Sequence, residues 1–266
     1  MNFSGKVAWV TGGSRGIGRA TALTLARLGA KVAVNSRRRT QGDEASGETD
    51  GAHHLLSLTG DVSDWEVVHE NARLIESRLG PVDVLVNNAG ILEPLGPTWK
   101  TPPDEWARTI EVNLIGAYHS IRAVVPGMVE RKRGAIVNVS SGAAAMTALN
   151  WSAYAASKAG LDHLTRSLAF ELAETGVRAN AFYPGLVETA MMQKLLTADA
   201  GKLPPSWRSY FEHAVEKGRV FAPEVIARVI AWLASEETDE LNGEILDIVR
   251  DPTVLERAND AFDAER

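Results

Sequence analysis

Residues 7–18 read Val7-Ala-Trp-Val-Thr-Gly-Gly-Ser-Arg-Gly-Ile-Gly18, an apolar run followed directly by a glycine-rich turn. The apolar run predicts a buried strand, and a helix-like segment follows the turn and ends near Gly29. Glycines in such a turn permit a tight bend and the close approach of a pyrophosphate, which the N–H groups and dipole of the helix favour. The stretch therefore predicts a nucleotide-binding unit. The alternative is a turn that only packs the helix on the strand.

The alternation of apolar runs with longer amphipathic segments continues along the chain. The runs are nearly continuous in apolar residues, as expected of parallel strands that are buried on both faces. We therefore predict an α/β fold, a doubly wound parallel sheet of about seven strands with helices on both faces, as a single domain over residues 1–266. The expected strands are Val7–Thr11, Lys31–Asn35, His54–Leu58, Val82–Asn87, Ala135–Ser140, Val177–Phe182 and Glu244–Ile248.

Two long helices are expected in the second half of this pattern. The first runs from about Asp104 to Arg131 as one apolar stripe, and Pro126 should kink it. The second runs from about Ser152 to Glu174, and its small residues leave one face open to close packing. These small residues are Ala155, Ala156, Ala159 and Gly160.

Three other segments have a different character. Arg37–Gly51 is polar and lacks an apolar face, so we expect a loop with at most a short helix. Residues 186–218 are expected to form a substrate lid. The tail at 249–266 is charged, with a possible short helix after Pro252.

Composition excludes several classes of function. The chain has 266 residues, no Cys and a formal net charge of -6. Disulfides and thiolate metal sites are excluded, no metal site is expected, and the absence of a dominant basic stripe argues against nucleic acid as a partner. No apolar run reaches the ~18 residues of a membrane span, and the N-terminus does not resemble a signal peptide. We expect a cytoplasmic protein without membrane contact.

A tyrosine and a lysine lie four residues apart in Ser152-Ala-Tyr-Ala-Ala-Ser-Lys158. On a helix Tyr154 and Lys158 project from the same face. A nearby ammonium favours the phenolate and lowers the pKa of the tyrosine, which gives a proton donor and acceptor for neutral pH. Taken alone, such a pair is more often an ordinary amphipathic pair on a surface helix.

Six motifs in sequence order together resemble the short-chain dehydrogenase/reductase family, in its single-domain branch with a Y-x-x-x-K motif. The resemblance covers roughly Gly5 to Ile248 and implies a Rossmann-like fold and an oxidoreductase. It departs from the family after the last strand, where Asp247-Ile-Val replaces the common Asp-Gly-Gly. The motifs are Thr11–Gly18, Asn87–Gly90, Asn113 in Glu111–Leu114, Ser141, the pair Tyr154 and Lys158, and Pro184-Gly185 with Thr189.

The resemblance implies a catalytic role for four residues. Tyr154 would donate the proton to the carbonyl oxygen, and Lys158 would lower the Tyr154 pKa and bind the nicotinamide ribose. Ser141 would hydrogen-bond the carbonyl oxygen. Asn113 would hold a water beside the lysine. As alternatives, Ser141 could be a turn residue at a strand end, and Asn113 could satisfy a backbone group at a helix kink.

Cofactor preference is predicted from the end of the second strand. Many NAD-binding relatives carry a carboxylate there, whereas this chain has Ser36 followed by Arg37. A guanidinium would bind the 2′-phosphate of NADP, and Arg15 offers a second cation. Arg38 and Arg39 are expected to be solvated. By resemblance the cofactor-binding set is Gly12, Ser14, Arg15, Gly16, Ile17, Gly18, Ser36, Arg37, Asp61, Val62, Asn87, Ala89, Gly90, Tyr154, Lys158, Pro184, Gly185, Val187 and Thr189, with Asp61 beside the adenine and Asn87 near the adenosine.

The sequence thus predicts an NADP-dependent carbonyl reductase or alcohol dehydrogenase that acts on a small-molecule carbonyl substrate. The substrate would be a hydrophobic ketone, a dicarbonyl or a 3-oxoacyl compound. A catalytically silent dinucleotide-binding regulator is the main alternative, and a sugar-nucleotide epimerase would need a larger C-terminal region. Family resemblance implies a homodimer or homotetramer through the two long helices. The expected substrate lining is Met146, Leu149, Trp151, Leu186, Met191, Met192, Trp207, Tyr210 and Phe211, and for Trp207–Phe211 a lid or core role is equally open.

Overall fold

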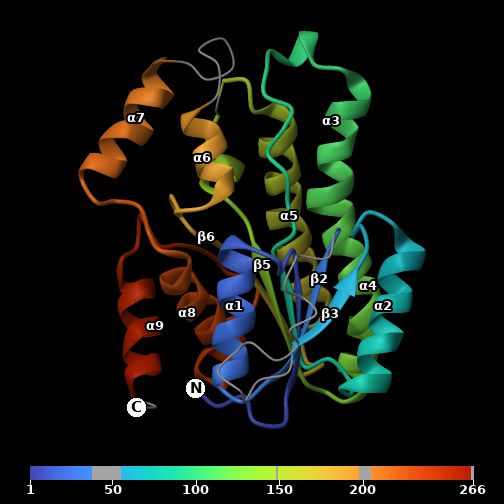
Figure 1. Cartoon of the computed structure of the whole chain (residues 1–266). Helices are drawn as coiled ribbons and strands as arrows, with labels where there is room; N and C mark the ends of the chain where they lie inside the picture. The colour runs from blue at the N-terminus through green and yellow to red at the C-terminus, as the bar shows by residue number, and fades with distance from the viewer. Residues whose placement is uncertain (38–54, 148, 198–204, 265–266) are drawn as a thin grey trace.

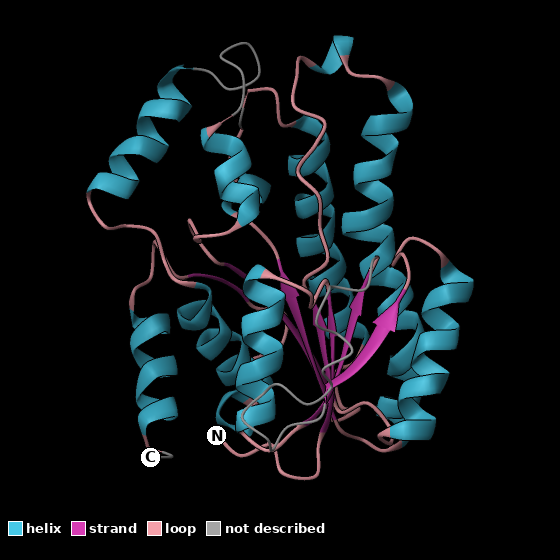
Figure 2. Cartoon of the chain, in the orientation of Figure 1, coloured by secondary structure: helices cyan, strands magenta, loops and turns pink. Residues whose placement is uncertain are grey.

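A computed structural model describes residues 1–37, 55–147, 149–197 and 205–264. Its centre is a seven-stranded sheet in the order β3-β2-β1-β4-β5-β6-β7, and every neighbouring pair is parallel (Figure 2). β2 and β3 lie on one side of β1, and β4 to β7 lie on the other side in sequence order. This is the arrangement of a doubly wound sheet. The predicted fold class is confirmed. The strands are β1 Val7–Thr11, β2 Lys31–Ser36, β3 Leu55–Thr59, β4 Val84–Asn87, β5 Gly134–Val139, β6 Val177–Tyr183 and β7 Ile245–Asp247.

The strands agree with the predicted runs to within two residues at each end. β1 matches exactly in extent, and β6 is one residue longer than predicted because Tyr183 still pairs with Asp247. β4 begins at Val84, two residues later than predicted, and the side chain of Asp83 just before it accepts a hydrogen bond from the Val7 N–H. The central strands β1 and β4 are buried along their whole length, as their continuous apolar runs predicted.

Helices cover both faces of the sheet (Figure 1). One face carries α1 Gly16–Arg27, α8 Pro223–Ala234 and α9 Thr253–Asp263, whose apolar residues form one core with β1 and β2. The other face carries α2 Trp65–Arg78, α4 Gly116–Glu130 and α5 Ser152–Glu171, which form a second core. The helix expected after Pro252 is α9.

The helix predicted from Asp104 to Arg131 has an interruption that the sequence pattern did not show. It consists of α3 Pro103–Ile110, a π-helical segment at Glu111–Ile115 and α4. Pro126 lies inside α4, which continues to Glu130. The interruption therefore falls around Asn113 and not at the proline. Such π segments are rare, and they occur frequently at functional sites.

Gly160 of α5 packs against this π segment. A Cβ added to Gly160 would lie 2.8 Å from the Leu114 side chain, so only glycine fits there without a shift. The close packing predicted for the small residues of α5 is present at Gly160, whereas Ala156 and Ala159 are exposed. It fixes the π segment against the helix that carries Tyr154 and Lys158.

Short elements complete the carboxyl edge of the sheet. The predicted lid region contains α6 Ala190–Leu196 and α7 Pro205–Glu216, which lie together above the sheet in Figure 1. Most of the predicted loop at Arg37–Gly51, including Arg38 and Arg39, lies outside the described residues. Across the described ranges, the chain has no helix with both the length and the apolar character needed to span a bilayer.

The 3₁₀ segments are Thr98–Lys100, Gly142–Ala144 and Glu236–Thr238.

Candidate functional site

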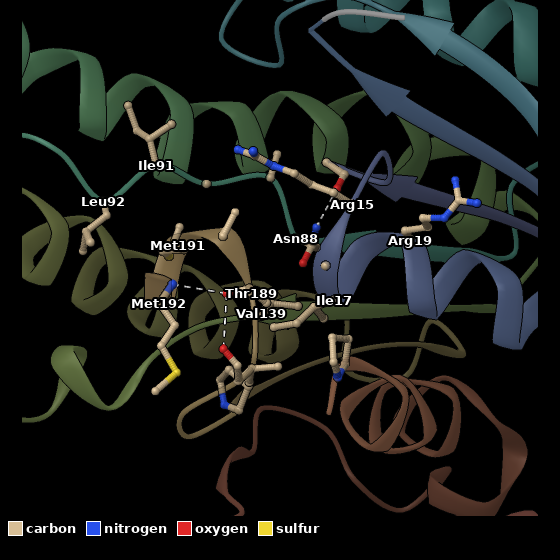
Figure 3. Close-up of a pocket in the computed structure, with 18 of the residues that line it drawn as sticks. Arg15, Ile17, Arg19, Asn88, Ile91, Leu92, Val139, Thr189, Met191 and Met192 are labelled. Carbon is tan, nitrogen blue, oxygen red and sulfur yellow. Dashed lines mark hydrogen bonds between the residues drawn. The ribbon is translucent and has the colours of Figure 1, made fainter. Parts of the chain in front are cut away.

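A cavity of about 570 Å³ lies at the carboxyl ends of the parallel strands, where ligands bind in open α/β sheets. Its walls come from the glycine-rich turn, the loops after β4 and β5, the start of α5 and the segment from Pro184 into α6 (Figure 3). The predicted residues that line it are Gly12, Ser14, Arg15, Gly16, Ile17, Ser36, Arg37, Asp61, Val62, Ala89, Gly90, Ser141, Tyr154, Lys158, Pro184, Gly185, Val187 and Thr189.

The glycine-rich turn is held against the loop after β4. The Asn88 amide donates hydrogen bonds to the carbonyls of Thr11 at 2.9 Å and Gly12 at 3.1 Å. A Cβ on Gly12, which has φ +66°, would lie 2.8 Å from the Cα of Ala89, and a Cβ on Gly18 would lie 2.4 Å from the Gly12 carbonyl oxygen. These two positions require glycine. Gly18 therefore shapes the turn from behind and does not line the cavity.

The turn presents the start of α1 to the cavity. Arg15 occupies the N-cap position in an extended conformation, and no side chain caps the helix. Gly16 and Ile17 line the cavity at this uncapped end. The first-turn N–H groups of a helix carry partial positive charge and need acceptors, so this end fits the phosphates of a dinucleotide.

Cations gather where β2 ends. Ser36 is the last residue of the strand, and Arg37, which is exposed, follows it on the cavity wall. Arg15 and Arg19 are also exposed and leave the start of α1 in different directions (Figure 3). No carboxylate stands at Asn35, Ser36 or Arg37, so none of these three side chains would repel a phosphate.

The carboxylate that does lie near this end belongs to Asp61. It accepts hydrogen bonds from the N–H and hydroxyl of Ser63, and it forms an ion pair with Arg108 of α3. Burial opposes its ionisation, but these hydrogen bonds and the Arg108 charge hold the pKa of Asp61 below its usual value. The sequence analysis missed Arg108, because it is 47 residues from Asp61 and no local motif connects the two.

Tyr154 and Lys158 lie side by side on the buried face of α5, with exposed fractions of 8% and 4%. The Lys158 Nζ donates a 2.7 Å hydrogen bond to the Val139 carbonyl and lies 5.8 Å from the centre of the Tyr154 ring. Ser141 hydrogen-bonds Tyr154. The structure therefore brings the predicted serine, tyrosine and lysine to one wall of the cavity. It rules out the exposed surface pair that a Y-x-x-x-K match could also have meant.

The expected lowering of the Tyr154 pKa is not found. Burial raises the pKa of Tyr154 above 10, and the hydrogen bond from Ser141 only partly offsets this. Burial also lowers the pKa of Lys158 to about 8, against the opposing effect of Asp162. Desolvation disfavours both charged forms and is the larger effect here. In this structure the phenol is held as a proton donor.

Asn113 lies behind this group and not on the cavity wall. Its amide nitrogen donates to the Ile91 carbonyl at 2.9 Å and to Ser157 at 3.0 Å, and its oxygen accepts from the Ile91 N–H at 2.8 Å. A Cβ added to Gly90 would lie 3.4 Å from the Asn113 oxygen and 3.8 Å from the Lys158 nitrogen. Asn113 thus fixes the loop after β4 close to Lys158, in line with the backbone-satisfying alternative.

Asn87 does not face the cavity. It is the last residue of β4, and its amide donates to the Asn138 side chain inside the sheet at 2.9 Å. Successive side chains of an extended chain point to opposite sides. The next residue, Asn88, therefore reaches the cavity instead. The prediction placed Asn87 near the adenosine, and the structure places its side chain in the core.

The outer half of the cavity is apolar. Trp151, Leu186, Met191, Met192 and Phe211 line it as expected. Met146, Leu149 and Tyr210 do not line it and are exposed.

Trp207 packs behind this lining. Its ring stacks on Trp151 at 5.5 Å, and Trp151 meets the ring of Tyr154 edge-on at 6.0 Å. Both alternatives for Trp207–Phe211 are therefore met, because Phe211 lines the cavity and also belongs, with Trp151 and Tyr154, to a small hydrophobic core against which Trp207 packs.

Comparisons with known proteins agree with this geometry. A family model described as short chain dehydrogenase matches residues 6–200. The chain is 34% identical to the 3-oxoacyl-[acyl-carrier-protein] reductase FabG of Thermotoga maritima, covering 93% of this chain and 98% of that protein. It is 38% identical to a cis-4-hydroxycyclohexanecarboxylate dehydrogenase of Sinomonas cyclohexanicum, covering 92% and 95%. A gluconate 5-dehydrogenase from Burkholderia cenocepacia J2315, solved in complex with NADP and tartrate, superposes with a TM-score of 0.83 at 29% identity, covering 92% and 94%.

Proposed function

The chain belongs to the short-chain dehydrogenase/reductase family, a family of oxidoreductases that use a nicotinamide dinucleotide, and on that premise we propose that it transfers a hydride between NADP(H) and a carbonyl or secondary alcohol. The observation that carries the proposal is the convergence of Ser141, Tyr154 and Lys158 on the cavity into which the glycine-rich turn opens. A cavity that only bound a dinucleotide would need the turn but not Ser141 or Tyr154. The alternative of a silent regulator is therefore less well supported.

The chemistry follows from the protonation states at the cavity wall. The bound nicotinamide supplies or accepts the hydride. As negative charge develops on a carbonyl oxygen, the buried Tyr154 phenol donates its proton to that oxygen. The Ser141 hydroxyl stabilises the same oxygen by a hydrogen bond. The ammonium of Lys158, close to the Tyr154 ring, stabilises the phenolate that remains.

Support for NADP comes from the cations at the end of β2. Arg37 and Arg15 can form charge-assisted hydrogen bonds to a 2′-phosphate, which Ser36 leaves unopposed. One structural relative is a complex with NADP. In NAD-binding sites of this fold a carboxylate holds the ribose hydroxyl instead.

Support for a hydrophobic substrate comes from the lining of the outer cavity. Trp151, Met191 and Phe211 offer apolar and aromatic contact beside Tyr154. One relative is named for a 3-oxoacyl substrate and another for a hydroxycyclohexane carboxylate. Both names are compatible with a substrate that has an apolar body. We therefore propose reduction of a hydrophobic ketone, dicarbonyl or 3-oxoacyl-type compound.

A substrate panel tests the proposal. Oxidation of NADPH and NADH is followed by absorbance with aliphatic, cyclic and aromatic ketones, dicarbonyls and 3-oxoacyl thioesters. The proposal expects turnover with NADPH, a higher kcat/KM for NADPH than for NADH, and better rates for apolar substrates than for sugars. Tight NADPH binding without oxidation by any compound would favour the silent regulator.

A further inference from the structure

A second buried charge lies on α5, one helical turn after Lys158. Asp162 is 4% exposed, and its Oδ2 accepts a 2.5 Å hydrogen bond from the hydroxyl of Tyr183 at the end of β6. Its Oδ1 is buried and has no hydrogen-bond partner among the residues that the structure describes. Neither residue belongs to the motifs of the sequence analysis, and neither lines the cavity.

A buried carboxylate with one unpaired oxygen costs free energy unless a positive charge compensates it. Lys158, at the i−4 position, is the cation on the same buried face of α5. The two side chains form no ion pair within 4 Å, because the Lys158 Nζ is turned to the Val139 carbonyl. Their interaction therefore acts through space, in a region where burial weakens screening by water.

Few other charged or titratable groups surround this pair in the part of the chain that the structure describes. Arg166, on the next turn of α5, is exposed. Asp247 approaches from β7 and interacts with Tyr183. Tyr154 lies on the far side of Lys158, and Arg108 of α3 is bound to Asp61. Asp162 is thus the group that opposes the loss of the Lys158 charge.

We infer that Asp162 is a positioning residue that keeps the buried Lys158 side chain in its ammonium form. The inference rests on the proposed function, in which the ammonium stabilises the Tyr154 phenolate. Burial lowers the pKa of Lys158 to about 8 and the Asp162 carboxylate raises it, which agrees with this role. The Tyr183 hydroxyl holds the carboxylate in place by its hydrogen bond.

The test is a titration of Lys158 in Asp162→Asn, a variant of nearly equal shape that can still accept the hydrogen bond from Tyr183. Lysine side chains labelled with ¹³C at Cε are followed by NMR against pH, and the Lys158 signal is assigned from its absence in Lys158→Arg. We expect the Lys158 midpoint to fall by about one pH unit in Asp162→Asn. The pH at which carbonyl reduction declines should fall by the same amount.

Asp83→Asn is the matched control. Asp83 is also a buried carboxylate, but it bonds the Val7 N–H and Arg133 at the opposite end of the sheet, so the Lys158 midpoint should not move. If Asp162→Asn does not fold, Asp162→Ser removes the charge with a smaller side chain and carries the same expectation.

A Lys158 midpoint that stays unchanged in a folded Asp162 variant overturns the inference, as does a shifted midpoint without a shift in the pH profile. Because the NMR titration needs no turnover, it remains informative if the proposed function fails. Absence of turnover in the wild type would count against the function alone.

Discussion

Single residues decide which dinucleotide the cavity suits. Ser36 ends β2 at the cavity wall and Arg37 follows it, and Arg15 occupies the N-cap position of α1. The electrostatics of this corner follow from the identity of the residues, so they could be predicted before the fold was known. The direction of each side chain could not be predicted in the same way. Asn87 was predicted to face the cavity, but its side chain lies inside the sheet and Asn88 lines the cavity instead.

We expect the double variant Ser36→Asp with Arg37→Ala to shift cofactor preference from NADPH toward NADH. The new carboxylate repels a 2′-phosphate, and the lost guanidinium removes a charge-assisted hydrogen bond. Together these should change the ratio of kcat/KM values by about 10- to 100-fold. Steady-state kinetics with both cofactors measure the ratio. Arg78→Ala, which removes an exposed arginine at the far end of α2, serves as the control, and an unchanged ratio in the double variant would contradict the NADP assignment.

Two contacts between residues that are distant in the sequence could not be predicted from the sequence. Arg108 meets Asp61, and Tyr183 meets Asp162, only because the fold brings distant segments together. The family motifs located Tyr154 and Lys158 but said nothing of their burial. Burial is what raises one pKa and lowers the other.

At the scale of elements, the strands could be predicted from the sequence, but the interruption of the long helix could not. Continuous apolar runs indicated every strand of the sheet to within two residues. The π segment at Glu111–Ile115 was not predicted, because a local widening of the helix leaves the spacing of its apolar residues almost unchanged. Its consequence is local and large, since it is the segment from which Asn113 reaches the backbone of Ile91.

Trp151, Trp207 and Phe211 form an aromatic wall, in which Trp207 of α7 packs behind Trp151. We expect Trp207→Ala to raise the KM for a hydrophobic ketone by about 5- to 10-fold, because the variant loses a stacking contact with Trp151 worth about 1 kcal/mol. The value of kcat should change little, since Tyr154 is untouched. Steady-state kinetics at saturating NADPH separate the two constants.

Trp99 provides the matched control for this prediction. It is 82% exposed and lies outside the aromatic wall, so Trp99→Ala should leave KM unchanged. Equal effects of the two substitutions would show that α7 does not shape the substrate site.

At the scale of the whole molecule, the buried Lys158 should leave a signature in stability. An unfolded lysine has a pKa near 10.5, whereas the pKa in the folded protein is about 8. Below pH 8 both states carry the proton, and the folded state bears the full cost of the buried ammonium. As the pH rises from 8 to 10.5 that cost disappears. The contribution of Lys158 to the free energy of unfolding should therefore increase by about 2–3 kcal/mol over this interval.

Urea unfolding at pH 8 and at pH 10.5 measures this increase. Other groups titrate in the same interval, so the comparison is with Lys158→Met, which lacks the titrating group. The wild type should gain the stated amount relative to the variant. A gain of the same size in both proteins would mean that Lys158 is not buried as the structure describes.

The central claim is that this fold delivers a hydride to a carbonyl carbon while Tyr154 protonates its oxygen. Its most direct test is isotope transfer from NADPH that carries deuterium at both C4 positions to a ketone that the wild type reduces, read by mass spectrometry of the alcohol. The wild type should place the deuterium on the carbinol carbon. Tyr154→Phe should form labelled alcohol about 10²- to 10⁴-fold more slowly while binding NADPH with nearly unchanged affinity. Alcohol without deuterium from the wild type, or labelled alcohol at the wild-type rate from Tyr154→Phe, would contradict the claim.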